Sequence, residues 1–465
     1  MIKVDLNWIT EQVHGQLIGE NLDVSGVTID SRKVQSGDLF IAIRGPNFDG
    51  HDYVDQAIAA GAVAVISSRP LQCECAQIMV ADTRYALGLL ARGVKTKLKL
   101  KTVAITGSSG KTTVKEMVAT ILRQQGEVLS TQGNFNNDIG VPLTLLNLTE
   151  QHEYAVIELG ANHRGEIAYT TGLVQPDVAL INNVSPAHVE GFGDIWGVAR
   201  AKTEIAKGLS EDGVIITNAD SDFHDYWMRE FAKRQHRVFS TEAANADVRA
   251  KDITSDEHGC VRFSLCAGGQ SVAVQLPLPG RHNVSNALAA ASLCIELGVS
   301  LKDIAQGLGA LNAVPGRMNI KEPGAGLRII DDTYNANVAS AKAALDVLAT
   351  FPGYRVMVLG DMGELGAHAR AYHEEVGAHA VEVAIDNLFT LGVLSQSASQ
   401  VFNGHGGQHF NNRSELLAAL SAIMQNEKEE LTILVKGSRS ARMEQVVEAL
   451  MQMAADDNQQ GRAAC

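Results

Sequence analysis

Cysteine and aromatic residues are scarce in this 465-residue sequence, and each scarcity excludes a class of protein. The six cysteines include no CxxC pair and no partner set for a zinc site. We therefore expect reduced thiols rather than a disulfide framework. Aromatic residues make up 5% of the chain and glycines number 43, a combination that favours a turn-rich α/β architecture over a β-sandwich.

Positive charge and long apolar runs are also limited. Lys and Arg number 39 against 53 Asp and Glu, and the formal net charge of −14 argues against non-specific binding to nucleic acid or to an anionic membrane. No uninterrupted apolar run approaches the ~20 residues that span a bilayer, and the N-terminus lacks the apolar core of a signal peptide. We therefore expect a cytoplasmic monomer with no nucleic-acid partner and no integral membrane segment.

Short apolar strands alternate with helical stretches along most of the chain, which predicts an α/β fold with crossover helices and mostly parallel sheets. The length suggests two to four domains. The expected domains cover residues 1–85, 86–313 and 314–453, with a flexible tail at 454–465. The second boundary lies at Pro315-Gly316.

A glycine-rich turn between a strand and a helix predicts a phosphate-binding loop. An apolar strand over 102–106 runs into Gly-Ser-Ser-Gly-Lys-Thr-Thr, and a helical pattern follows. Backbone N–H groups at such a helix start attract anions, the lysine adds a cation, and a threonine hydroxyl can bind Mg²⁺. Ile105 stands where the full eight-residue motif has its first glycine, so the loop is a shortened form. The candidate ATP-binding residues are Gly107, Ser108, Ser109, Gly110, Lys111, Thr112 and Thr113.

Six further segments share their pattern with one enzyme family. Together with the loop they resemble the Mur ligases, the ATP-dependent amide-forming enzymes of peptidoglycan assembly, in order from about residue 25 to residue 450. The resemblance implies three domains: a small α/β UDP-binding domain, a central P-loop ATPase domain with a parallel sheet, and a Rossmann-like C-terminal domain. The segments are 133–142, 158–167, 182–193, 280–287, 331–337 and 435–439.

The resemblance also implies a reaction. ATP phosphorylates a peptide carboxylate, an amine attacks the acyl phosphate, and phosphate leaves. The similarity is strongest to the member that adds D-alanyl-D-alanine to UDP-N-acetylmuramoyl-tripeptide in cytoplasmic precursor synthesis. The alternatives are another Mur ligase, such as the one that adds the third peptide residue, a ligase like folylpolyglutamate synthase, and a P-loop protein that uses ATP as a switch without ligation.

Four residues carry the implied catalytic roles: Lys111, Glu158, His188 and Lys202. The resemblance makes Thr112, Glu158, His188 and Lys202 the Mg²⁺ ligands. His188 would act through water, because Mg²⁺ prefers oxygen donors, and Lys202 would carry a CO₂-derived carbamate. Each also has an ordinary alternative, such as a surface glutamate, a loop histidine or a solvated helix lysine.

The remaining implied contacts concern the nucleotide and the two substrates. Asn283 and Asn286 would face the adenine, although asparagine at a helix start is also a common cap. Arg317 and Asp332 would reach the nucleotide only after the domains close. The implied substrate-binding residues are Ser31 and Arg32 for UDP, Asn134, Asn136 and Asn137 for the muramoyl-peptide, and Tyr334, Asn335, Asn337, Lys436, Ser438 and Arg439 on the C-terminal side.

Overall fold

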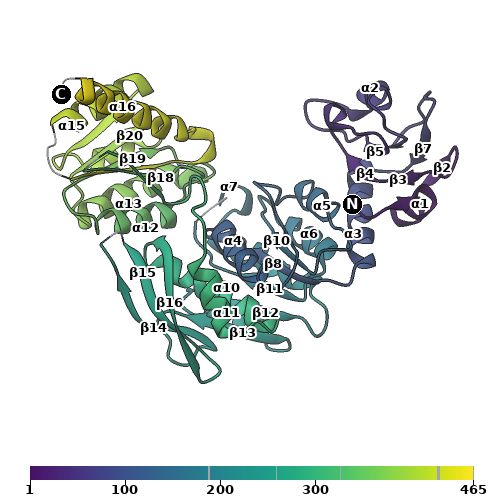
Figure 1. Cartoon of the computed structure of the whole chain (residues 1–465), viewed down its shortest axis with the longest axis horizontal. Helices are drawn as coiled ribbons and strands as arrows, with labels where there is room; N and C mark the ends of the chain where they lie inside the picture. Colours follow the sequence, from purple (N-terminus) through teal and green to yellow (C-terminus); the bar gives the residue numbers. More distant parts are fainter. Residues whose placement is uncertain (187–188, 258, 325, 427–429, 464–465) are drawn as a thin grey trace.

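The computed structural model contains three units that follow one another along the chain, each built on its own sheet (Figure 1). It describes residues 1–186, 189–257, 259–324, 326–426 and 430–463. Among these residues, none of the helices combines the length and the apolar character needed to cross a bilayer. Cys73, Cys75, Cys260, Cys266 and Cys294, the cysteines inside the described ranges, are free thiols as expected.

The N-terminal unit has a five-stranded sheet in the order β2-β7-β6-β5-β4, in which only the pairing of β2 is antiparallel. A separate two-stranded ribbon pairs β1 with β3. The strands are β1 (Val4–Asp5), β2 (Gln16–Ile18), β3 (Asp23–Val24), β4 (Gly26–Thr28), β5 (Asp38–Ile41), β6 (Ala64–Ser67) and β7 (Ala76–Met79). The helices are α1 (Leu6–Val13), α2 (Val54–Ala59) and α3 (Thr83–Lys97), with 3₁₀ turns at Ser31–Lys33 and Gly50–Tyr53.

The central unit has a nine-stranded sheet in the order β16-β15-β14-β13-β12-β11-β8-β10-β9. Helix α3 packs its apolar face into a core that continues from the first sheet to the central one. The strands are β8 (Lys101–Thr106), β9 (Val128–Ser130), β10 (Tyr154–Glu158), β11 (Val178–Ile181), β12 (Val214–Asn218), β13 (Gln235–Ser240), β14 (Val248–Ser255), β15 (Cys260–Ala267) and β16 (Gln270–Pro279). The helices are α4 (Lys111–Leu122), α5 (Gly140–Leu145), α6 (Glu166–Val174), α7 (Val189–Phe192), α8 (Ile195–Thr203), α9 (His224–Glu230), α10 (His282–Glu296) and α11 (Leu301–Gly309), with a 3₁₀ turn at Glu204–Gly208.

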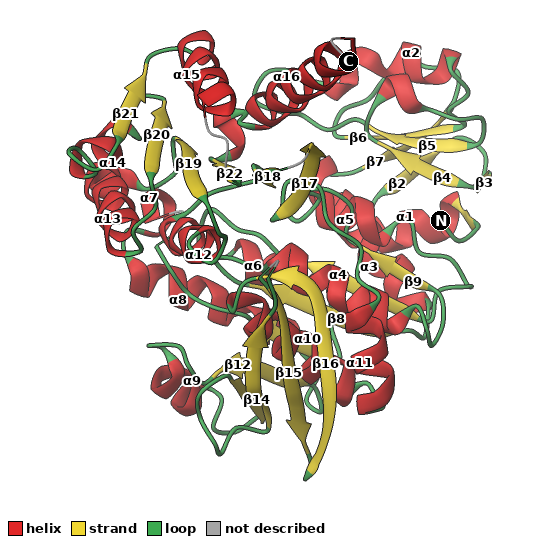
Figure 2. Cartoon of the chain, turned by 60° about the vertical axis from the view of Figure 1, so that its left-hand side comes forward, coloured by secondary structure: helices red, strands yellow, loops and turns green. Residues whose placement is uncertain are grey.

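One edge of the central sheet differs from the predicted parallel pattern. Strands β14, β15 and β16 form an antiparallel ribbon that extends the sheet at one end (Figure 2). Ala267 pairs with Gln270 across a two-residue turn, Gly268-Gly269, and both glycines have positive φ. Such a turn joins adjacent antiparallel strands, so no crossover helix is needed there.

The C-terminal unit has a six-stranded sheet in the order β17-β18-β22-β19-β20-β21, with β17 antiparallel. Its core has two layers, with α12 and α13 on one face and α15 and α16 on the other (Figure 1). The strands are β17 (Asn319–Gly324), β18 (Leu327–Asp332), β19 (Tyr354–Gly360), β20 (Asn387–Leu391), β21 (Gly407–Phe410) and β22 (Leu431–Lys436). The helices are α12 (Val338–Leu348), α13 (Ala369–Glu382), α14 (Gln396–Val401), α15 (Arg413–Asn426) and α16 (Glu444–Ala463), with 3₁₀ turns at Gly366–His368 and Arg439–Ala441.

The last helix is longer than the sequence pattern predicts. Helix α16 continues to Ala463 and so includes most of the segment 454–465, which we expected to be a flexible tail. Alanine and glutamine in this segment favour a helix, whereas Asp456, Asp457, Asn458 and Gly461 are poorer helix formers.

Candidate functional site

The predicted phosphate loop lies at the carboxyl end of β8, where the chain turns into α4. The helix begins at Lys111, and Gly110 precedes it with a left-handed φ of 74°. A Cβ at this glycine would lie 2.4 Å from Asn286 Oδ1, so the loop can follow this path only with glycine there. Strands β10 and β11 flank β8 in parallel, so their carboxyl ends lie beside the loop, which is where ligands of open α/β sheets bind.

Lys111 lies against the loop instead of extending into solvent. Its Nζ donates a hydrogen bond to the carbonyl oxygen of Gly107 at 2.9 Å. Burial lowers the pKa of Lys111, while the nearby Glu158 carboxylate raises it and Arg317 lowers it further. The side chain therefore stands where it can contact an outer phosphate, and burial has the largest influence on its pKa.

A network of asparagine amides, which the sequence pattern did not predict, holds the loop in place. Asn183 Oδ1 accepts from Ser109 N at 2.9 Å, and Asn182 Nδ2 donates to Ser109 O at 3.0 Å and to Asn286 Oδ1 at 3.1 Å. Asn286 in turn donates to Asn283 Oδ1 at 3.0 Å. These asparagines therefore connect α10 and the end of β11 to the phosphate loop. Neither Asn283 nor Asn286 caps α10, because Arg281 occupies the cap position.

Glu158 ends strand β10 and lies directly opposite the start of α4. It is 3% exposed, and its two carboxylate oxygens accept hydrogen bonds from Thr112 Oγ1 at 2.8 Å and from Asn136 Nδ2 at 2.9 Å. The carboxylate and the threonine hydroxyl are both hard oxygen donors, which suits Mg²⁺. Asn136, implied for the muramoyl-peptide, thus also fixes the orientation of this carboxylate.

Lys202 is a buried lysine at the end of α8, and it lines the cavity beside the phosphate loop. Only 5% of it is exposed. Burial lowers the pKa of Lys202 well below its ordinary value, and repulsion from the Lys111 ammonium lowers it further. The ordinary alternative, a solvated helix lysine, does not describe this position.

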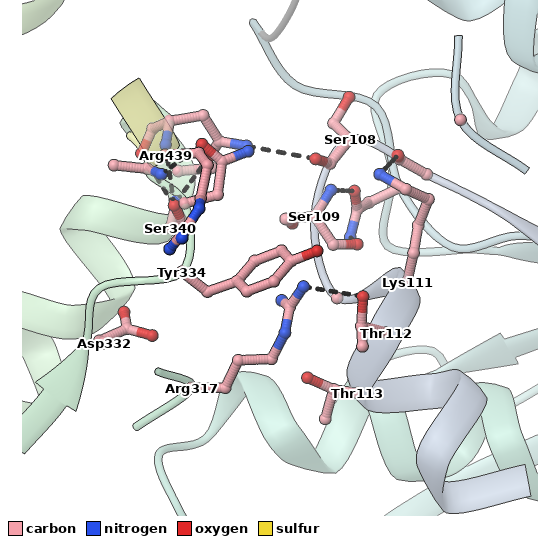
Figure 3. A pocket seen from close by; sticks show the side chains of 18 of the residues that line it. Ser108, Ser109, Lys111, Thr112, Thr113, Arg317, Asp332, Tyr334, Ser340 and Arg439 are labelled. Atoms are coloured by element: carbon pink, nitrogen blue, oxygen red, sulfur yellow. Dashed lines mark hydrogen bonds between the residues drawn. The ribbon is translucent and has the colours of Figure 1, made fainter. Parts of the chain in front are cut away.

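The C-terminal unit reaches the phosphate loop with two side chains. Arg317 Nη2 donates to Thr112 Oγ1 at 2.7 Å, and its guanidinium stacks 4.2 Å from the ring centroid of Tyr334 (Figure 3). Asn337 Nδ2 donates to Ser108 O at 3.3 Å. We expected Arg317 to reach the nucleotide site only after the domains close. In this structure Arg317 already contacts the phosphate loop. Among the described atoms, Arg317 Nε is buried and has no hydrogen-bond partner.

Asp332 and Lys436 lie in register on the neighbouring strands β18 and β22 and form a buried ion pair. Lys436 Nζ approaches Asp332 Oδ2 to 2.5 Å and also donates to Asn335 O at 2.9 Å. Beyond β22, Ser438 Oγ donates to the Asp361 carbonyl at 2.7 Å. The Arg439 side chain is 68% exposed and forms an ion pair with Glu444 at 3.3 Å.

These elements enclose one cavity of about 680 Å³ between the central and C-terminal units. Most of the predicted site residues line it: 107–113, Asn134, Asn136, Asn137, Glu158, Lys202, Asn283, Asn286, Arg317, Asp332, Tyr334, Asn335, Asn337, Lys436, Ser438 and Arg439. His188 lies outside the described residues. Ser31 and Arg32 lie in the N-terminal unit and are not among the lining residues; Ser31 Oγ donates to Gln56 Oε1 at 3.0 Å, and Arg32 pairs with Asp30.

Among the described residues that line the cavity there is one histidine, His282, and no cysteine. Within the described ranges, no three His, Cys, Asp or Glu side chains cluster as a metal site would require. An ion beside Glu158 and Thr112 would take its other ligands from phosphate oxygens and water, the pattern of Mg²⁺ bound with a nucleotide.

Known proteins resemble the chain over nearly its whole length. The UDP-N-acetylmuramoyl-tripeptide–D-alanyl-D-alanine ligase of Escherichia coli (strain K12) is 49% identical over 452 residues, 97% of this chain and 99% of that protein. A crystal structure of MurF from Acinetobacter baumannii is 38% identical and superposes with a TM-score of 0.92 over 97% of this chain and 99% of that one. The MurF ligase from Thermotoga maritima in complex with ADP is 30% identical, with a TM-score of 0.84 over 93% and 99% of the two chains.

Three family descriptions match the three units in order. They are the Mur ligase family catalytic domain at residues 23–97, the Mur ligase middle domain at 105–294, and the Mur ligase glutamate ligase domain at 316–439. The first covers the N-terminal sheet from β4 onward, the second begins at the end of β8, and the third ends three residues beyond β22. With these matches and the full-length relatives, the chain belongs to the Mur ligase family.

Proposed function

We propose that this protein is the ATP-dependent ligase that joins D-alanyl-D-alanine to UDP-N-acetylmuramoyl-tripeptide in the cytoplasmic synthesis of peptidoglycan precursors. One observation carries the proposal: a single cavity combines the phosphate loop, the Glu158 carboxylate and the β18 and β22 loops, in a chain whose full-length relatives bear that name. Both halves of an acyl-phosphate reaction can then take place in one enclosed space.

The chain's own groups fit the first half of the reaction. The tripeptide carboxylate attacks the terminal phosphorus of ATP, which gives an acyl phosphate and ADP. Loop N–H groups at the start of α4 would hold the phosphates, and Lys111 would neutralise charge that develops on the transferred group. Arg317, 2.7 Å from the Thr112 hydroxyl, brings a second cation to the same place.

Thr112 and Glu158 fit a magnesium ion carried with the nucleotide. Their oxygens are 2.8 Å apart, buried, and of the hard type that Mg²⁺ prefers. When bound, the ion would offset repulsion between the triphosphate and the substrate carboxylate. His188 and Lys202 are the other two predicted ligands of this ion.

We further propose that Lys202 carries a carbamate. Burial favours the neutral amine, whose nitrogen can bond to the carbon of CO₂; one proton goes to solvent, and the product is an oxygen-donor anion. The expected adduct gives a ¹³C NMR signal in ¹³CO₂-equilibrated wild-type protein, and Lys202→Ala lacks it. Acetate or formate should restore part of the activity lost in Lys202→Ala but none in Lys202→Arg. Full activity of Lys202→Ala in CO₂-depleted buffer would exclude the carbamate role.

The second half of the reaction needs the amine of the dipeptide. It attacks the acyl carbon, and phosphate leaves the tetrahedral intermediate. Asn134, Asn137, Tyr334, Asn335 and Asn337 line the cavity and supply amide and hydroxyl groups for the peptide parts of both substrates. Ser438 and Arg439 lie past the end of β22 and suit the dipeptide carboxylate.

The other parts of the proposal concern the whole chain. We assign UDP to the N-terminal unit through Ser31 and Arg32, place domain boundaries near residues 85 and 314, and expect a monomer. The three separate sheets fall inside these boundaries, although α3 (Thr83–Lys97) crosses the first one.

The decisive experiment measures ADP formation against a panel of substrate pairs. ADP should form only with UDP-N-acetylmuramoyl-tripeptide and D-alanyl-D-alanine together. Another Mur ligase would respond to a single amino acid, a folylpolyglutamate synthase-like enzyme to a folate with glutamate, and an ATP switch to neither. Any of these three results would overturn the assignment.

A further inference from the structure

A buried ammonium lies directly beneath the phosphate loop and has no place in the reaction described above. Lys115 follows Lys111 by one turn of α4, so both side chains project from the same face of the helix. Lys115 is only 2% exposed. Its Nζ donates to the Thr131 carbonyl oxygen at 2.6 Å and lies 2.7 Å from Glu116 Oε1.

Thr131 connects Lys115 to Glu158 through hydrogen bonds. Thr131 follows the last residue of β9 and is completely buried. Its Oγ1 accepts a hydrogen bond from Glu158 N at 3.0 Å, and its own N–H donates to Val156 O at 3.1 Å. Thr131 therefore holds the backbone of β10 at the residue that carries the carboxylate.

Helix α4 thus meets Glu158 from two directions. Thr112, in the first turn, donates to the carboxylate itself at 2.8 Å. Lys115, in the next turn, acts on the backbone of the same residue through Thr131. Burying an ammonium is costly unless its hydrogen bonds and ion pairs are well made, and Lys115 has both a carbonyl and a carboxylate within reach.

We propose that Lys115 is a positioning residue for ligation: with Thr131 it fixes the Glu158 carboxylate against the Thr112 hydroxyl, so that both present oxygen to the divalent cation of the nucleotide. The inference rests on the proposed function, because the divalent cation in question is the one that would accompany ATP in ligation. The arrangement matches the general rule that partners of a metal-binding side chain set its orientation and so its affinity for the metal.

The test is Lys115→Met, which keeps the length of the side chain and removes the donor. Binding of Mn²⁺ together with a non-hydrolysable ATP analogue, followed by electron paramagnetic resonance, should weaken by roughly 10–100-fold. In turnover, the apparent KM for Mg²⁺ should rise by a similar factor, while the KM for the UDP-tripeptide stays unchanged. Lys115→Gln, which keeps a donor without the charge, should fall between Lys115→Met and wild type.

The chain offers a matched control in Lys95. This partly buried lysine of α3 also donates to a backbone carbonyl, that of Gln175, at 2.8 Å, and it is not among the residues that line the cavity. Lys95→Met should lower stability as Lys115→Met does and leave Mn²⁺ affinity unchanged. Equal Mn²⁺ affinities in the two variants would overturn the proposal, because Lys115 would then be only structural.

A second pair of variants covers the case in which Lys115→Met does not fold. Thr131→Ser keeps the hydroxyl that accepts the hydrogen bond from Glu158 N. Thr131→Val has nearly the same shape as threonine and lacks this hydroxyl. Weak Mn²⁺ binding in Thr131→Val but not in Thr131→Ser supports the proposal, and equal binding in both overturns it. Because these readouts need no peptide substrate, they remain informative even if the wild-type protein fails to ligate the proposed pair.

Discussion

Two helices, α4 and α12, begin at the same cavity, each after the carboxyl end of a parallel strand, and their first residues differ. Helix α4 follows Gly110, which has no side chain to cap it. Helix α12 follows Asn337, whose side chain accepts from Ser340 N at 2.9 Å while Ser340 Oγ accepts from Asn337 N at 3.0 Å. The chain thus satisfies the first N–H groups of α12 itself and leaves those of α4 available.

The difference shows which helix start can bind an anion. Uncapped N–H groups and the positive end of the helix dipole suit the start of α4 to the proposed binding of phosphate, whereas the start of α12 is already capped. The lysines on the two sides differ in the same way. Lys111 lines the cavity beside the loop, whereas Lys436 forms an ion pair with Asp332. Asn337 joins the two sides, since its Nδ2 donates to Ser108 O.

The largest expected effect comes from breaking the ion pair on the C-terminal side. Lys436→Met leaves the Asp332 carboxylate buried without its ammonium, and we expect the C-terminal unit to lose about 3–5 kcal/mol in the free energy of unfolding. Chemical denaturation measures this. The double variant Lys436→Met with Asp332→Asn should recover a large part of the loss; an equal or greater loss would show that the two side chains are not coupled.

On the α4 side, Lys111→Ala should act on turnover and not on stability. We expect ADP formation to fall by about 100–1,000-fold, because the transferred phosphate loses its cation, with unfolding changed by less than about 1 kcal/mol. Lys342→Ala is the control, since Lys342 forms only a surface pair with Glu375. Near-normal turnover in Lys111→Ala would remove the basis for the phosphate-loop assignment.

Gly110→Ala tests the residue at the N-cap position of α4. The left-handed φ alone should cost about 1–2 kcal/mol in stability, and the new Cβ would push against Asn286 and displace the loop. Gly298 is the control, because its φ is 90° and an added Cβ would have no neighbouring atom within 4 Å. Gly298→Ala therefore reports the backbone strain alone. Calorimetric titration with an ATP analogue should show weakened binding only in Gly110→Ala; equal binding in both would mean that the loop tolerates the methyl group.

Asn337→Ala should have the smallest effect. Loss of the α12 cap is worth about 1 kcal/mol in the free energy of unfolding. Ser300→Ala removes a comparable cap from α11, where Ser300 Oγ accepts from Asp303 N at 3.2 Å, and should cost a similar amount. Only Asn337→Ala should also reduce kcat, because only that side chain reaches the phosphate loop. Identical kinetics in the two variants would show that the contact with Ser108 carries no function.

The sequence predicted the residues that a local pattern marks. The glycine turn before α4 was predicted from its own pattern, whereas Glu158 and Arg317 were assigned through the family resemblance, and all of them line the cavity. The antiparallel edge formed by β14, β15 and β16 was not predicted, although Gly268-Gly269 between two alternating segments was a usable signal.

Partners that depend on strand register could not be read from the sequence. Asp332 and Lys436 are 104 residues apart and meet because β18 pairs in register with β22. Lys115, Thr131 and Asn183 are ordinary polar residues in the sequence. Their hydrogen bonds arise only when β9, β10 and β11 align around β8.

The contacts of Arg317 with Thr112 and of Asn337 with Ser108 join residues 205 and 229 positions apart, while the central and C-terminal sheets have separate apolar cores. Hydrogen bonds between units are weaker than the packing within them, so we expect the central and C-terminal units to separate before either sheet unfolds. Urea should therefore inactivate the enzyme at concentrations that leave its circular dichroism unchanged, and saturating nucleotide should bring the two transitions together by binding across the junction.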